Sequence, residues 1–196
     1  MNCKGFAAII AVLLLVSLPA AAGCVTVTEA PPPKTDPASE SASNFSLSSM
    51  AFNEGEPIPV KYSCDGQNVS PPLAWSQPPP ETQAFTLIVD DPDAPIGAFT
   101  HWVLFNIPAT ASQLPEGIPA IEQLETGALQ GKNGAGKIGY MGPCPPRGST
   151  HRYRFTIYAL DSRLDLKQSA FKDQVLKALE GHILAQYQLV GTYQRH

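Results

Sequence analysis

Two proline-rich segments carry the residues whose types and spacing could do chemistry. In the first, Asp91 and Asp93 follow directly on an apolar run, in the stretch DDPDAP, and His101 opens the next apolar run. In the second, the stretch GPCPP precedes His151. Because proline fixes φ, both stretches should be stiff loops that hold nearby side chains in place. If the strands beside these loops are neighbours, the two carboxylates and two imidazoles converge on one pocket rim.

Such a rim suits a small phosphate-like anion. Imidazoles and loop N–H groups can donate hydrogen bonds to its oxygens. Aspartates beside the imidazoles would favour their protonated form and could also receive a ligand ammonium group. Each residue also has a plainer interpretation, because Asp93 can cap a turn, His101 can be a structural histidine and His151 can lie on the surface.

Strands must position these loops. Alternating or β-branched apolar runs predict strands over 45–52, 84–91, 101–108, 153–160 and 182–194, the last with a bulge at Gly191. One helix is expected near residues 169–180, with Ser169 as its N-cap and Gly181 after its end. Twenty prolines disfavour an all-helical bundle. The sequence therefore predicts a mainly β domain of two packed antiparallel sheets, most simply a sandwich, with one short helix.

The N-terminal segment is typical of an export signal. Residues 6–22 form an apolar run that contains Pro19 and leads into the small-residue stretch AAGC. We expect residues 1–23 to be a signal peptide, Cys24 to carry a diacylglycerol, and residues 24–43 to be a flexible Pro/Ser/Thr tether before a domain over 44–196. This describes an exported prokaryotic lipoprotein of the cell envelope. An ordinary signal peptide cut after residues 20–22 and an uncleaved anchor are the alternatives.

Charge and cysteine content further restrict the class of protein. Thirteen basic and seventeen acidic residues give a net charge of −4, so there is no basic excess for binding nucleic acid. Cys64 and Cys144 would remain as an even pair in an exported domain. A disulfide and two free thiols both stay open, because the sequence does not give the distance between their Cα atoms.

Long stretches of the chain resemble one family. DPDAP followed by HWVLFNIP, and then GPCPPRGSTHRYRFTIYALD, resemble the two signature blocks of the phosphatidylethanolamine-binding protein family, in particular its prokaryotic Raf-kinase-inhibitor-like branch. SPPLAW and GHILAQYQLVGTYQR are similar to that branch as well, so the resemblance spans residues 44–196. It implies a large antiparallel sheet packed on a smaller one, with an anion pocket at one end. The pocket residues that it implies are Asp91, Asp93, Pro95, His101, Gly142, Pro145, Pro146, His151 and Tyr153.

The resemblance and the residues together favour a non-catalytic binding or regulatory protein. Its pocket would hold phosphate or a phospho-head-group, without a cofactor or metal, and its protein partner would be a kinase or a protease that it inhibits. Mammalian members have a C-terminal helix near the pocket with no counterpart after Tyr193, so their kinase specificity is not carried over. A hydrolase that uses the His/Asp cluster, with or without a metal, is one alternative, although no HExxH or GxSxG motif is present. A structural envelope protein with an unused pocket is the other.

Overall fold

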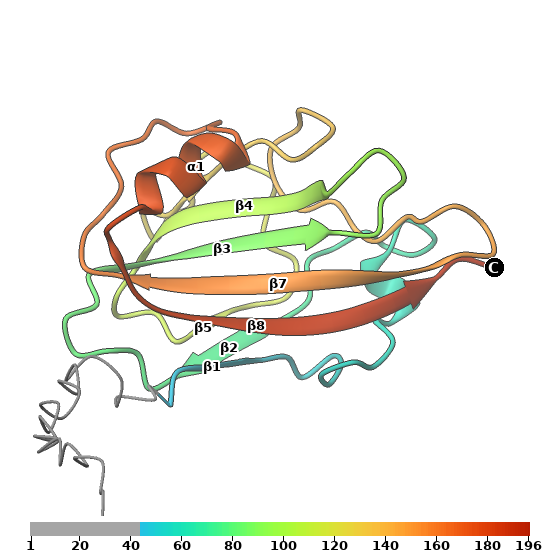
Figure 1. Ribbon diagram of the computed structural model, residues 1–196, viewed down its shortest axis with the longest axis horizontal. Coiled ribbons are helices and arrows are strands. Elements are labelled where there is room, and N and C mark those ends of the chain that lie inside the picture. The colour runs from blue at the N-terminus through green and yellow to red at the C-terminus, as the bar shows by residue number, and fades with distance from the viewer. Residues whose placement is uncertain (1–43) are drawn as a thin grey trace, which may run out of the picture. The chain divides into compact units, whose positions relative to one another are not determined.

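The computed structural model describes residues 44–196, which form two antiparallel sheets and one short α-helix (Figure 1). The predicted fold class is thereby confirmed. The lipidation site and the tether lie outside the described residues. The larger sheet has the strand order β6-β4-β3-β7-β8 and the smaller one β1-β2-β5. The elements are β1 (Ser46–Ser48), the 3-10 helix η1 (Val60–Tyr62), β2 (Leu73–Ser76), β3 (Ala84–Asp91), β4 (Phe99–Pro108), β5 (Gln113–Leu114), β6 (Leu129–Gln130), β7 (Thr150–Leu160), α1 (Lys172–Leu179) and β8 (Ile183–Gln194).

The central strands are buried on both faces, which explains their nearly continuous apolar sequence. Along β3, Phe85 and Leu87 point into the main core, whereas Ile88 points into a second cluster shared with α1. Trp102 and Val103 divide in the same way along β4. A strand covered on both faces has no solvent side to mark with polar residues, so alternation is lost. Among residues 44–196, no helix is long and apolar enough to cross a membrane.

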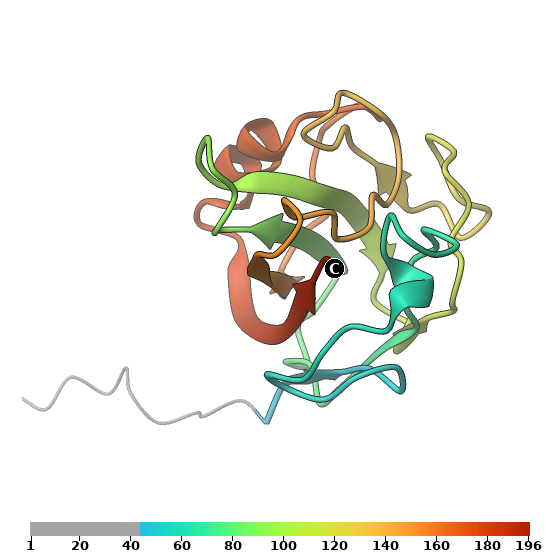
Figure 2. The same ribbon diagram turned by 90° about the vertical axis from the view of Figure 1, so that its right-hand side faces the viewer.

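The order of the large sheet brings the two proline-rich segments together. β3 lies between β4 and β7 and is antiparallel to both, so the C-terminal end of β3 lies beside the N-terminal ends of the other two. Asp91 pairs with Phe99, and Asp90 pairs with Arg154. Both flanking strands begin earlier than the sequence predicts, at residues 99 and 150, so His101 and His151 lie inside strands. Figure 2 views the molecule from this end of the sheet, and the C-terminus lies among the loops there.

The helix start differs from the prediction. α1 begins at Lys172, and Ser169 is not its N-cap. Ser169 has a left-handed backbone, with φ of 67°, and its hydroxyl donates to Glu122. The side chain of Gln174 instead reaches back to accept the backbone N–H of Phe171. The Ser169 hydroxyl, which local sequence rules would use as the N-cap of the helix, is therefore bound in a tertiary contact instead.

The predicted bulge at Gly191 is also wrong. The register of β7 and β8 shifts between Ala159 and Leu160, while Gly191 pairs regularly with Tyr153. A Cβ atom at Gly191 would lie 2.5 Å from Cγ1 of Ile58, so this glycine permits a close approach between β8 and the chain around residue 58.

Candidate functional site

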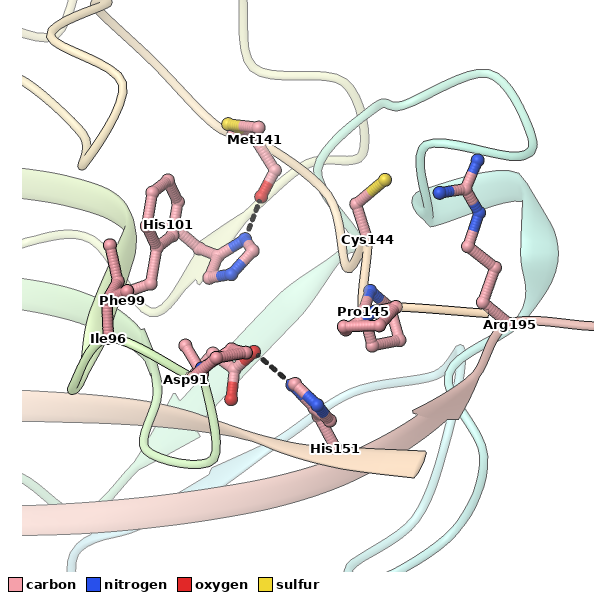
Figure 3. A pocket seen from close by; sticks show the side chains of 12 residues that line it. Asp91, Ile96, Phe99, His101, Met141, Cys144, Pro145, His151 and Arg195 are labelled. Carbon is pink, nitrogen blue, oxygen red and sulfur yellow. Dashed lines mark hydrogen bonds and ion pairs between the residues drawn. The ribbon is translucent and has the colours of Figure 1, made fainter. Parts of the chain in front are cut away.

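A cavity of about 470 Å³ opens at the end of the large sheet where β3 ends and β4 and β7 begin (Figure 3). Six of the nine predicted pocket residues lie on its wall. Both histidines and Asp91 are among them, so the two proline-rich segments meet at this end of the sheet, whereas Asp93 does not line the cavity. The wall is formed by Asp91, Ala94, Pro95, Ile96, Phe99, His101, Met141, Cys144, Pro145, Pro146, His151 and Arg195.

A buried carboxylate–imidazole pair forms one side of the cavity. Oδ2 of Asp91 lies 2.7 Å from Nδ1 of His151, and both side chains are less than a tenth exposed. The other carboxylate oxygen accepts the backbone N–H of Asp93 at 2.8 Å. These two contacts fix the carboxylate and assign the Nδ1 proton of His151. Its Nε2 lies 3.4 Å from Oγ of Ser149, whose own proton is directed to the carbonyl of Pro146 at 2.6 Å.

His101 lies on the opposite side of Asp91 from His151 (Figure 3). Its Nδ1 donates to the carbonyl oxygen of Met141 at 2.6 Å, and the residue is buried, at 3% exposure. Burial lowers the pKa of His101, and this effect outweighs the Met141 carbonyl and the Asp91 charge, which act in the other direction. The expectation that neighbouring aspartates would favour the protonated ring is therefore not met at this histidine.

Three predicted residues lie next to the cavity wall. The first two are Asp93 and Gly142. The carboxylate of Asp93 accepts the backbone N–H of Arg152 at 2.9 Å and its Nη2 at 2.6 Å. This partner holds the pKa of Asp93 well below its usual range. Gly142 donates its N–H to Asn68, and a Cβ there would meet the carbonyl of Tyr62 at 2.2 Å. Both residues thus shape the loops that carry the wall.

Tyr153 is the third predicted residue that lies next to the cavity wall. It is fully buried in β7, and its ring packs edge-on against His101 with 5.1 Å between the ring centroids. Its hydroxyl is buried without a hydrogen-bond partner among residues 44–196. Burial, together with the negative charge of Asp91, raises the pKa of this phenol. Tyr153 therefore helps to orient the His101 ring and stays protonated.

A disulfide ties down the second proline loop. Cys64 and Cys144 are bonded, with 5.4 Å between their Cα atoms, which settles the alternative that the sequence leaves open. The backbone N–H of Cys64 also donates to the carbonyl of Pro143 at 3.0 Å. The even cysteine count was one signal in the sequence, and the structure shows that these two loops, 80 residues apart in the chain, are neighbours.

Sequence reasoning missed several wall residues. Arg195 is the basic residue among them, and its Nε donates to Asp65 at 3.0 Å. It reaches the cavity because the end of β8 runs beside the start of β7, with Thr150 paired to Gln194. The other missed residues are apolar or belong to the disulfide: Ala94, Ile96, Phe99, Met141 and Cys144. Among residues 44–196, no three His, Cys, Asp or Glu side chains are grouped to hold a metal ion.

Comparison with known proteins gives a consistent result. A sequence model described as phosphatidylethanolamine-binding protein matches residues 48–194. A protein of Methanothermobacter thermautotrophicus named "UPF0098 protein" is 50% identical over 151 residues, which cover 77% of this chain and 99% of that protein.

Two solved structures share the fold. One is a phosphatidylethanolamine-binding protein homologue from Chlamydia trachomatis, 44% identical with a TM-score of 0.72 over 79% of this chain and all of that chain. The other is YbcL of E. coli, described as a member of the mammalian family, 33% identical with a TM-score of 0.71 over 78% of this chain and 99% of that chain. The chain therefore belongs to the phosphatidylethanolamine-binding protein family.

Proposed function

We propose that this chain is a binding protein rather than an enzyme, and that its pocket takes a small phosphate-like anion, free or as part of a phospho-head-group. One observation carries the proposal. His101 and His151, on the two strands that flank β3, line the same cavity, and Arg195 completes its wall. Each charge-assisted hydrogen bond between such a wall and an anion contributes about 1.5–3 kcal/mol.

Isothermal titration of the chain with inorganic phosphate tests this function. Replacing His151 by alanine removes one partner of the anion and should weaken binding roughly ten- to a hundredfold. His182→Ala is the matched control, because His182 also pairs with an aspartate, Asp161, but lies outside the cavity. Equal phosphate affinity in His151→Ala and wild type would contradict the proposed pocket.

The proposal places the domain outside the cytoplasm, tethered to the envelope by a lipid on Cys24. The disulfide between Cys64 and Cys144 supports an oxidising compartment. We expect the protein to fractionate with membranes and Cys24→Ser to release it, since a diacylglycerol supplies two chains. Soluble wild-type protein whose N-terminus is not residue 24 would exclude this tether.

Regulation of a protein partner, a kinase or a protease, completes the proposal. The rim of the pocket offers a contact surface, because Ile96 lies on the cavity wall with 94% of its surface exposed. Capture of envelope proteins on the immobilised chain, with Ile96→Asp as the comparison, tests this part. A partner retained by wild type and lost with Ile96→Asp is the expected result. Identical captured proteins would argue against this rim as the contact surface.

A further inference from the structure

We propose that the pocket selects an anion that brings its own acidic proton, of the hydrogen-phosphate class, over equally charged anions that carry none. This inference rests on the proposed function and adds the ligand class. His101 is the residue that we expect to decide the selection, with Asp91 and His151 in support.

The hydrogen bond on the far side of the His101 ring fixes its state toward the cavity. A carbonyl oxygen only accepts, so the 2.6 Å contact with Met141 requires the proton on Nδ1. Burial disfavours a second proton on this ring. A neutral imidazole protonated at Nδ1 has a lone pair at Nε2. His101 therefore acts as a hydrogen-bond acceptor on the cavity wall.

The neighbouring carboxylate of the wall is an acceptor as well. The Asp91 carboxylate can only accept, and its two oxygens already receive the protons of His151 Nδ1 and the Asp93 backbone. A bare anionic oxygen placed against these atoms would meet lone pairs, whereas an O–H of the ligand can donate to them.

The surrounding charges do not change this pattern. Asp90 is paired with Lys172 at 2.9 Å, and Asp93 with Arg152 at 2.6 Å, so each of these outer carboxylates has its own cation. Asp91 has His151 as its partner, and the Tyr153 ring packs edge-on against His101. Arg195 also lies on the wall, where its Nε is bonded to Asp65 at 3.0 Å, so its terminal guanidinium nitrogens are the ones that can attract the ligand's negative charge.

Anions differ in the proton that this wall requires. Phosphate monoesters hold an acidic proton in their monoanionic form, with a second pKa of about 6. Inorganic phosphate keeps one proton even as a dianion, whereas sulfate and phosphodiesters have none to donate. Hydrogen phosphate and sulfate are thus a matched pair of tetrahedral dianions that differ by the proton in question.

The test compares these two ions on the full chain by isothermal titration. At about pH 8, above the ordinary histidine pKa of about 6.5, phosphate should bind at least tenfold more tightly than sulfate. The ratio should shrink as the pH falls, because protonation of the His101 ring turns its Nε2 into a donor. Dimethyl phosphate should behave like sulfate.

Two variants locate the selection. In His101→Gln the side-chain amide can present N–H₂ instead of a lone pair, so the preference for phosphate should fall several-fold. His182→Gln should keep the wild-type ratio. If His101→Gln does not fold, the pH dependence of the wild-type ratio still decides. Equal affinities of wild type for phosphate and sulfate at about pH 8, above the ordinary histidine pKa, would overturn the inference and leave the anion pocket standing. Binding of neither ion would instead refute the proposed function.

Discussion

The molecule contains two histidine–aspartate pairs of the same chemistry in opposite settings. His151 and Asp91 are 2.7 Å apart, with 8% and 6% of their side chains exposed. His182 and Asp161 are 2.8 Å apart, with 47% and 44% exposed. The first pair lines the cavity where β3 ends, and the second joins the end of β7 to the start of β8 at the other end of the sheet (Figure 1). Distance does not distinguish them, whereas burial and a cavity wall do.

The contrast shows which physical conditions make a pair part of a site. An exposed pair is screened by water and contributes little to stability. A buried pair is costly to desolvate, and the loss of one partner strongly destabilises the protein. Neighbouring groups must therefore hold both partners in an accurate geometry. Around Asp91 this is achieved by a backbone N–H from Asp93 and by the stiff loop that contains Pro92 and Pro95.

Cutting the disulfide should have the largest effect on the pocket end. Cys64→Ser combined with Cys144→Ser opens a link between residues 80 apart and should lower the free energy of unfolding by about 4 kcal/mol. Urea unfolding measures this change. The loop should keep its place, because the Cys64–Pro143 and Gly142–Asn68 hydrogen bonds remain. An unchanged unfolding free energy would show that the cross-link does not stabilise this end.

Breaking each pair tests the comparison itself. Asp91→Ala leaves the buried Nδ1 proton of His151 and the Asp93 N–H without their acceptor, and should lower the free energy of unfolding by about 3 kcal/mol. Asp161→Ala should leave it close to the wild-type value, because that pair is solvated. Equal losses in urea unfolding would mean that burial does not separate the two pairs.

The pH dependence of stability should show a smaller effect from His101. Its pKa is lowered by burial, so as the pH falls the unfolded chain takes up this proton first. The stabilisation is therefore complete above about pH 6.5 and decreases below it, with a slope of at most about 1.4 kcal/mol per pH unit. Urea unfolding over this range should give a flatter profile for His101→Gln than for wild type and His182→Gln. Parallel profiles would contradict the assignment.

Local signals in the sequence predicted much of the architecture. The apolar runs located β3 at its observed bounds and located β4, β7 and β8 with shifts at their starts, and the proline loops located both histidines. The predictions failed where tertiary contacts decide. Ser169 gives its hydroxyl to Glu122 instead of capping α1, and Gly191 accommodates Ile58 instead of a bulge.

The cavity wall shows the same limit. Asp91, His101 and His151 stood out because their residue types suggest chemistry, and strand adjacency then brought them together. Arg195 could not be found in this way, because its place depends on the pairing of β7 with β8. The hydrogen bond from His101 to the Met141 carbonyl, which fixes the acceptor nitrogen, was likewise invisible in the sequence.

The most direct test of the central claim is an NMR titration of the histidine side chains with inorganic phosphate. If His101 and His151 share one anion pocket, their ring signals should move together and saturate with a single dissociation constant, while the His182 signals stay in place. The shared pocket would be contradicted if His101 and His151 responded with different dissociation constants, or if His182 shifted as much as they do.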